Sequence, residues 1–266
     1  MSRISEAVIL MAGTGSRLRH NNGIVPKPLT PILDRPLVSY TIDVLAGAGI
    51  TILHAVVGYQ SAALISGLRP LIPPGIELLL TDNPNWQKQN GLSVLAAANH
   101  VTKPFLLTMA DHLFDETIVD LLIEHAELGE LSLAIDGKIE SICDIDDAMK
   151  VKMHGNRVAA IGKDLAKYDA IDTGMFICPL ALFDYLERAK KNGDCSLADG
   201  VRLMAADGKV RGIDIGDSWW QDVDTPEMLR QAEERLAARF KRVGSSPDVR
   251  SKLRRGEQLP LQTSLR

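Results

Sequence analysis

The sequence has only three cysteines, Cys143, Cys178 and Cys195, and no two of them form a C-x-x-C pair. Disulfide frameworks and structural zinc sites both need paired or regularly spaced cysteines, so neither is expected. An odd number of unspaced thiols is typical of a protein kept in a reducing compartment, and a cytoplasmic location is predicted.

Long apolar runs are also lacking. None approaches the roughly 18 residues that a membrane-spanning helix needs. Residues 1–6 lead into an apolar strand that is too short for the hydrophobic part of a signal peptide. We therefore expect a soluble chain without stable membrane insertion.

An excess of positive charge is absent as well. The 30 basic and 34 acidic residues give a net charge of −4, so nucleic acid is not an expected partner. A nucleotide substrate needs only a local positive pocket and remains possible. No heptad pattern or long apolar stripe indicates an oligomeric state, which stays open.

What is present is a repeated pattern of short apolar runs and amphipathic stretches, which is typical of an α/β fold with a mostly parallel sheet. In the first half we expect strands at residues 7–12, 52–57, 76–80 and 105–109, and helices at 36–48, 60–68, 91–100 and 116–128. In the second half we expect a hairpin at 148–161, strands at 172–178, 210–215 and 219–223, and helices at 181–190, 196–206 and 226–240. One domain is predicted over residues 1–242, followed by a flexible basic tail over 243–266.

A glycine-rich loop follows the first strand. Ala12, Gly13, Thr14 and Gly15 can turn their backbone N–H groups toward a phosphate, because glycine lets the chain approach closely. Arg17 adds a bidentate donor for triphosphate oxygens. Ten residues later, Lys27 stands between two prolines that restrict the local backbone. The spacing predicts a nucleotide phosphate site with Lys27 as its fixed positive charge.

Two other phosphate-binding motifs are excluded. A dinucleotide fingerprint needs a third glycine where the chain has Leu18, which argues against a Rossmann oxidoreductase. A Walker A loop needs Gly-Lys followed by Ser or Thr, and the loop lacks it.

Three carboxylates have the positions expected of ligands for Mg²⁺, which prefers oxygen. Asp111 follows the apolar strand 105–109, at the edge where α/β sheets bind ligands. Asp222 and Asp224 alternate in an extended segment, which predicts that they share a face and repel each other unless a cation lies between them. Which of the two lies closer to the metal stays open.

Other polar residues are interpreted as structural. Asp144, Asp146 and Asp147 have the pattern of a solvated acidic loop, and His112 that of a structural histidine rather than a catalytic base.

These motifs resemble the nucleotidyltransferases that activate sugar and polyol phosphates. The segments 12–18, 26–28 and 220–226 and Asp111 carry the general resemblance. The segments 90–95, 108–113, 150–152, 161–165 and 169–174 are similar to inositol-1-phosphate cytidylyltransferases. The resemblance implies a Rossmann-like three-layer α/β/α sandwich with a mixed, mostly parallel sheet, as in nucleotide-diphospho-sugar transferases.

The resemblance also implies roles for individual residues. The loop residues Gly13 to Arg17 would bind the triphosphate of CTP, and Lys27 would contact the α-phosphate. Nucleotide contacts near base and ribose are implied for Asn90, Gly91 and Ser93. Acceptor contacts are implied for Lys163, at the phosphate, and for Asp172, Thr173 and Gly174, near the polyol. Lys27, Arg17 and Lys163 would then be the catalytic cations.

The expected reaction is transfer of a cytidylyl group from CTP to a phosphorylated polyol such as inositol 1-phosphate, with Mg²⁺ as cofactor and pyrophosphate as second product. A sugar 1-phosphate, phosphocholine or phosphonate acceptor, with CTP or UTP, stays an alternative, as does a non-catalytic nucleotide-sensing subunit of the same fold. Some members of the family fuse this domain to a membrane-embedded alcohol phosphotransferase, and here we expect that later step to belong to a separate protein.

Overall fold

A nine-stranded mixed sheet forms the centre of the computed structural model, which describes residues 4–18 and 25–245. Its strands lie in the order β5-β4-β1-β6-β11-β8-β12-β10-β9. Their bounds are β1 Glu6–Leu10, β4 Ile52–Val57, β5 Glu77–Asp82, β6 Phe105–Met109, β8 Leu131–Asp136, β9 Lys150–His154, β10 Arg157–Gly162, β11 Ala170–Cys178 and β12 Val210–Asp214. Two short antiparallel two-stranded sheets pair β2 (Pro31–Ile32) with β3 (Arg35–Pro36), and β7 (His112–Phe114) with the distant β13 (Trp220–Asp222).

The strands β5, β4, β1 and β6 are parallel to one another, so their carboxyl ends share one edge of the sheet. Leu10 at the end of β1 lies opposite Val56 on one side and Met109 on the other. The loop after β1 and the loop after β6 therefore begin side by side. This register places the glycine-rich loop next to Asp111.

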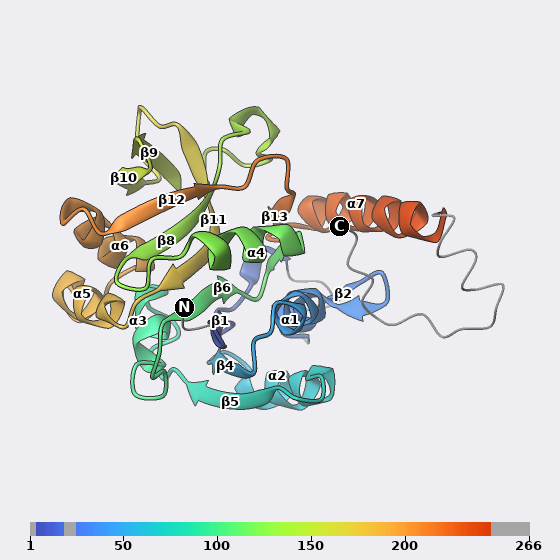
Figure 1. Cartoon of the computed structure of the whole chain (residues 1–266). Helices are drawn as coiled ribbons and strands as arrows, with labels where there is room; N and C mark the ends of the chain where they lie inside the picture. The colour runs from blue at the N-terminus through green and yellow to red at the C-terminus, as the bar shows by residue number, and fades with distance from the viewer. Residues whose placement is uncertain (1–3, 19–24, 246–266) are drawn as a thin grey trace.

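Helices cover both faces of the sheet and give three layers (Figure 1). One apolar cluster joins the sheet to α1 (Leu37–Gly47), α2 (Ser61–Leu68) and α4 (Glu116–His125). A second joins the other face to α3 (Gly91–Ala96), α5 (Ala181–Ala189) and α6 (Leu197–Ala206). Because both faces are covered, β1 is buried at all its positions, as its unbroken apolar run predicts. The predicted three-layer α/β fold is confirmed.

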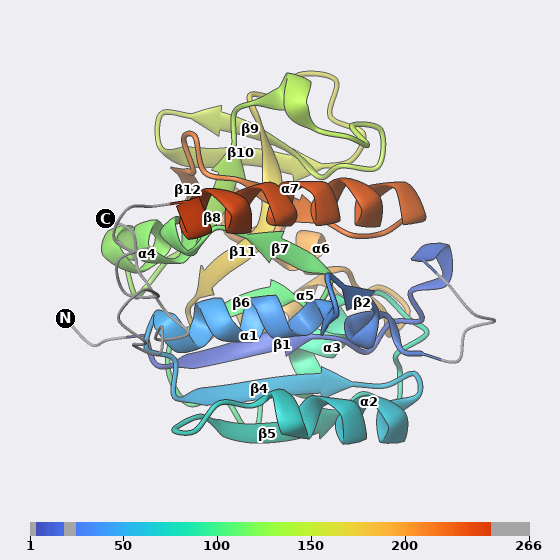
Figure 2. The ribbon, with the colours of Figure 1, turned by 90° about the vertical axis from the view of Figure 1, so that its right-hand side faces the viewer.

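The helix α7 (Pro226–Ser245) crosses the molecule above α1, with β7 between them (Figure 2). Its Ala232 and Leu236 share a small apolar cluster with Leu18, Leu113 and Val223. The helix extends beyond its predicted end at residue 240, so the predicted domain boundary at 242 falls inside it. The predicted tail lies outside the described residues from 246 onward. No helix in the described part of the chain is long and apolar enough to cross a membrane.

The structure differs from the prediction at two places near the site. The strand β8 was not expected, although all six of its residues are buried. Its leucines and alanine have no strong strand preference, and β8 forms because β11 and β12 pair with it on either side. The predicted helix 91–100 ends at Ala96, because the N–H of Ala97 and of Ala98 each bond three residues back and tighten the chain into turns.

Candidate active site

The glycine-rich loop forms one wall of a cavity of about 220 Å³ at the carboxyl end of β1. Gly13, Thr14, Gly15 and Arg17 line it, together with Lys27, Asp111 and Asp224 from other parts of the chain. Ala12 is buried, and its carbonyl accepts a hydrogen bond from the Tyr59 N–H at 2.9 Å. Ala12 thereby anchors the loop to the segment that follows β4. We refer to this space as the phosphate-loop cavity.

Lys27 has the most enclosed charge in the phosphate-loop cavity. It opens a short 3₁₀ turn, η3 (Lys27–Leu29), and its side chain is only 8% exposed. The Nζ atom lies 2.6 Å from Asp111 Oδ2 and 2.5 Å from Asp224 Oδ1. The two carboxylates come from distant segments of the chain, and Lys27 joins them.

The position of Lys27 leaves no room for a side chain at residue 15, which is a glycine. A Cβ at Gly15 would lie 2.4 Å from the Lys27 Cβ, and the glycine has a φ of +56°. Both the contact and the left-handed backbone disfavour any side chain here. The glycine lets the loop pass directly over the lysine stem.

We expect Gly15→Ala to lower the free energy of unfolding by about 1–2 kcal/mol, because strain and a clash add at one residue. Gly13→Ala is the matched control, since a Cβ there meets nothing within 4 Å. Urea denaturation of the two variants measures the difference. Equal stabilities would show that the loop does not depend on this contact.

A two-stranded pairing brings the separate acidic stretches together. In the β7–β13 pair, Asp222 lies opposite His112, directly after Asp111. The Val223 N–H then donates to the Asp111 carbonyl at 2.9 Å. The chain around residue 223 is thus bonded to the end of β6, with an acidic residue on each side of Val223.

The charges of this cluster stabilise one another. Burial by itself would raise the pKa of Asp111, but the Lys27 ammonium and a 2.8 Å hydrogen bond from His112 Nδ1 outweigh it and hold that pKa well below its usual range. Burial by itself would lower the pKa of Lys27, but the carboxylates of Asp111 and Asp224 outweigh it and raise that pKa. Lys27 and Asp111 are therefore both charged at neutral pH.

Asp222 and Asp224 lie at two different cavities, rather than sharing a face as alternation predicts. Asp224 lines the phosphate-loop cavity, and Asp222 lines the adjoining one. The strand β13 ends at Asp222, so the alternation does not continue to Asp224. Asp224 receives hydrogen bonds from Lys27 and Arg17, whereas no described side chain donates one to Asp222.

The residues Asp111, Asp222 and Asp224 fit a divalent cation by their chemistry. All three offer carboxylate oxygens, which hard cations prefer. Burial raises the pKa of Asp222, and the nearby carboxylates Asp224 and Asp111 add to this effect, whereas His112 and Lys27 partly oppose it. Within the described residues no three acidic, histidine or cysteine side chains already surround one point. The Lys27 ammonium binds two of the three carboxylates instead.

Arg17 and Lys163 approach each other through Asp147. Arg17 donates to Asp147 at 2.8 Å and to Asp224 at 2.6 Å, and the Lys163 ammonium pairs with the other Asp147 oxygen. Asp147 remains 41% exposed, as a solvated loop predicts, but its two ion pairs were not expected. Folding brings the acidic loop to Lys163, 16 residues away, and to Arg17, 130 residues away.

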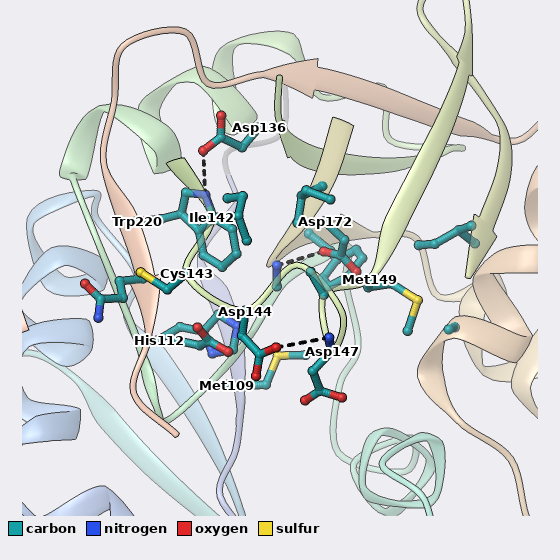
Figure 3. A pocket seen from close by; sticks show the side chains of 18 of the residues that line it. Met109, His112, Asp136, Ile142, Cys143, Asp144, Asp147, Met149, Asp172 and Trp220 are labelled. Atoms are coloured by element: carbon teal, nitrogen blue, oxygen red, sulfur yellow. Dashed lines mark hydrogen bonds between the residues drawn. The ribbon is translucent and has the colours of Figure 1, made fainter. Parts of the chain in front are cut away.

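A second, larger cavity of about 300 Å³, shown in Figure 3, is lined by Asp222 and by His112, the residue after Asp111. Its lining mixes carboxylates, sulfur and aromatic side chains, including Met109, His112, Asp136, Cys143, Met149, Asp172 and Trp220. The Trp220 indole N–H donates to Asp136 at 2.9 Å, which fixes the ring at the cavity wall. We refer to this space as the acceptor cavity, after the acceptor contacts that the resemblance implies for Asp172 and Gly174, which line it.

A bend in β11 turns Asp172 and Gly174 into the acceptor cavity. The pairing of β11 with β8 shifts register between Asp172 and Phe176. Gly174 has a φ of +75°, and its N–H donates to Asp172 Oδ1 at 2.7 Å. A Cβ on Gly174 would lie 2.4 Å from the His112 ring, so only glycine fits against the histidine. His112 is thus fixed between Asp111 and Gly174.

Three predicted ligand residues are placed differently from what was expected. Ser93 is buried and accepts a hydrogen bond from Asn83 at 2.9 Å, and Thr173 is fully buried and donates to the Ala134 carbonyl. Their hydroxyl groups are thus engaged in hydrogen bonds inside the protein. Gly91 lies against Cys195, whose carbonyl oxygen would be 2.5 Å from a Cβ there, so its small size serves helix packing.

Asn90 does line the acceptor cavity, where its side-chain oxygen accepts the Leu197 N–H at the start of α6. The sequence interpretation did not assign Asp136 or Trp220 to the site. Both had a usable signal. Asp136 ends an apolar run as Asp111 nearly does, and Trp220 stands two residues before Asp222.

Comparison with known proteins places the chain in a family. Residues 7–139, half of the chain, match the MobA-like NTP transferase domain. A bifunctional IPC transferase and DIPP synthase from Rubrobacter xylanophilus is 31% identical over 86% of this chain and 51% of its own length. The corresponding protein from Thermococcus kodakarensis is 33% identical over 86% of this chain and 50% of its own length. The chain thus spans about half the length of these curated relatives.

Solved structures agree with the fold. The inositol-1-phosphate CTP transferase from T. maritima superposes with a TM-score of 0.78 at 27% identity, over 88% of this chain and 95% of that one. A UDP-glucose pyrophosphorylase from Acinetobacter baumanii superposes with a TM-score of 0.71 at 16% identity, over 90% of this chain and 98% of that one, which concerns the fold alone. With its phosphate loop beside a carboxylate cluster, the chain belongs to the MobA-like NTP transferase family and is a nucleotidyltransferase enzyme.

Proposed function

We propose that this enzyme transfers a cytidylyl group from CTP to inositol 1-phosphate, giving CDP-inositol and pyrophosphate. The observation that carries the proposal is the position of the carboxylate cluster between two cavities. Asp111 and Asp224 line the phosphate-loop cavity, and Asp222 lines the acceptor cavity. Two anionic substrates entering from the two sides would meet at this cluster. The choice of CTP and inositol 1-phosphate is supported by the names of the relatives and by the T. maritima structure.

In the proposed reaction an oxygen of the acceptor phosphate attacks the α-phosphorus of CTP, and the bond from that phosphorus to the β-phosphate oxygen breaks. Pyrophosphate leaves with the electron pair of that bond. The acceptor phosphate is already anionic at neutral pH, so no residue has to remove a proton. The residues of this site therefore act by positioning and by electrostatic stabilisation.

Each cation of the site has a place in this scheme. The loop N–H groups of residues 13–15 and Arg17 bind the triphosphate, and Lys27 faces the α-phosphate, where negative charge accumulates. Lys163 binds the acceptor phosphate. A divalent cation such as Mg²⁺, bound by Asp111, Asp222 and Asp224, would supply Lewis-acid charge at the phosphates. Lys27 contacts two of these carboxylates, Asp111 and Asp224, and partly neutralises them.

Asp172 is the candidate contact for the hydroxyl groups of the acceptor. It lines the acceptor cavity, and one of its oxygens already accepts the Gly174 N–H. Burial raises the pKa of Asp172 to about 6, although the Gly174 and His112 interactions oppose the change. The ionised carboxylate is therefore held in an unfavourable environment at neutral pH. Hydroxyl donors of a polyol would relieve it.

We expect Asp172→Asn to stabilise the free protein at pH 7 while weakening use of the acceptor. An acid with a raised folded pKa costs stability above that pKa, because the folded state has to bury the charge. The gain from the amide is expected to be on the order of 1 kcal/mol at pH 7. It should shrink as the pH falls through 6 and vanish below 3.8, the ordinary pKa of aspartate.

Urea denaturation at pH 7.5 and pH 3.5 measures this stability change, and the KM for inositol 1-phosphate measures the functional cost. We expect that KM to rise while the KM for CTP stays unchanged. A variant that is less stable at pH 7.5, or that has an unaltered acceptor KM, would contradict the assignment.

The proposed function is tested by pyrophosphate release with CTP and inositol 1-phosphate, in Mg²⁺ and after its removal with EDTA. ATP, GTP and UTP are compared as donors, and glucose 1-phosphate, phosphocholine and a phosphonate as acceptors. Product only with another acceptor would retain nucleotidyl transfer and discard inositol 1-phosphate. Product that does not depend on a divalent cation would discard the carboxylate metal site.

A further inference from the structure

The Asp147 carboxylate pairs with one cation from the phosphate loop and with one from the segment after β10. One oxygen accepts from Arg17 Nη1 at 2.8 Å, and the other pairs with the Lys163 ammonium. Arg17 belongs to the 3₁₀ turn η1 (Ser16–Leu18) in the phosphate loop, and Lys163 follows β10. These two cations are assigned above to the donor and to the acceptor.

The acidic loop is itself ordered by backbone contacts. The Asp147 N–H donates to the Asp144 carboxylate, as Figure 3 shows, and the Ala148 N–H donates to the Asp144 carbonyl at 3.0 Å. On the far side, the Lys150 ammonium donates to the Lys163 carbonyl at 2.7 Å. The loop and the segment after β10 are therefore tied together, and the position of the Asp147 carboxylate follows from them.

Arg17 and Lys163 need such a partner, because both side chains are about half exposed. A long exposed side chain visits many rotamers, and ordering it costs conformational entropy when a ligand binds. Arg17 also pairs with Asp224, so Asp147 and Asp224 together orient its guanidinium toward the carboxylate cluster. Among the residues that the structure describes, Asp147 is the one side chain that pairs with the Lys163 ammonium.

We propose that Asp147 is a positioning residue that orders Arg17 and Lys163 in advance, so that the donor and acceptor phosphates are gathered at one point. The proposal rests on the proposed function for the roles of the two cations. It predicts that a residue on the acceptor side influences the donor side. It also predicts that removing the negative charge of Asp147 weakens the binding of the substrate phosphates. A purely electrostatic effect would be the opposite, because Arg17 and Lys163 would then be less neutralised and would attract anions more strongly.

The test is Asp147→Asn, with Asp146→Asn as matched control on the same loop. Asp146 is exposed, and no described residue forms a hydrogen bond with its side chain. We expect kcat/KM to fall about tenfold for both substrates in Asp147→Asn, chiefly through KM, and to stay unchanged in Asp146→Asn. Asp147→Glu, which keeps the charge, should recover part of the loss. Lys163→Met should raise only the KM for the acceptor. In the Lys163→Met background, Asp147→Asn should raise the acceptor KM by a smaller factor than it does in the wild type, because its partner Lys163 is already absent.

Equilibrium titration with inorganic triphosphate gives a second measurement that requires no turnover. We expect about tenfold weaker binding in Asp147→Asn than in the wild type or in Asp146→Asn. Equal or tighter binding of triphosphate would overturn the proposal, because it would mean that Asp147 merely masks the cations. If the wild-type enzyme binds triphosphate but transfers no nucleotide to any acceptor, the proposed function fails, while this titration still decides the role of Asp147.

Discussion

Replacing Lys27 with methionine is expected to lower kcat by at least about 10²–10³-fold, because a fixed donor facing the developing charge is removed. We expect a larger effect than for a lysine at the protein surface, because Lys27 is held in a fixed position. Lys27 Nζ is within 2.6 Å of two carboxylates, and its side chain is 8% exposed. Methionine keeps the length of the stem that packs against Gly15, so the change is mainly one of charge.

A stability cost should accompany the loss of activity. Without the ammonium, Asp111 and Asp224 face each other with no cation between them, and the pKa of Asp111 rises. We expect the free energy of unfolding at pH 7 to fall by on the order of 1–3 kcal/mol, less than for a fully buried pair, since both carboxylates retain some exposure.

Pyrophosphate release and urea denaturation measure the two effects of Lys27→Met. Lys103→Met is the matched control, because Lys103 is exposed, lies outside both cavities and has no hydrogen bond or ion pair with the described residues. A folded Lys27→Met enzyme with near-normal turnover would remove Lys27 from the mechanism and leave it a purely structural ion-pair partner.

Replacing Asp111 with asparagine is expected to lower kcat by at least about 10²-fold and to raise the concentration of Mg²⁺ needed for half-maximal rate. The amide keeps the volume of the carboxyl group and one of its two accepting oxygens, for Lys27 or for His112, so the fold around β7 should persist although one of these two hydrogen bonds is lost. What it loses is the negative charge for which a divalent cation and Lys27 both compete. Combined with Lys27→Met, the two effects should not add, because the residues act on the same phosphate.

The pH dependence of stability gives an independent reading of Asp111. A carboxylate whose pKa is lowered in the folded state contributes stability above its ordinary pKa of 3.8, and that stability is lost as the pH falls toward the lower folded value. The destabilisation by Asp111→Asn should therefore be full at pH 7 and shrink in acid. Asp120→Asn, on the exposed side of α4, should show neither effect. Normal activity without altered Mg²⁺ dependence would exclude Asp111 as a metal ligand.

The features that could be predicted from the sequence are those formed by residues close together along the chain. The apolar strand before Ala12, the glycines of the loop and the lysine between two prolines are local features, and they indicated a phosphate site directly. Asp111 was found because the end of a parallel strand has a known place in an α/β sheet. The hairpin of β9 and β10 was predicted from its turn residues.

The parts that could not be predicted depend on contacts between distant segments. The sequence determined that a glycine-rich loop, a lysine and three carboxylates occur in one chain, and by resemblance it indicated a nucleotidyltransferase. Only the tertiary structure decided that Lys27 lies between Asp111 and Asp224, that Asp222 lines a different cavity from Asp224, and that Asp147 pairs with Arg17 and Lys163. The reason is physical: the ion pairs of Lys27 and Arg17 join residues that lie 84 to 207 positions apart, where the spacing along the chain carries no information about distance. The hydrogen bonds of Ser93 and Thr173 also depend on tertiary packing. The Ser93 hydroxyl accepts from Asn83, and the Thr173 hydroxyl donates to the Ala134 carbonyl.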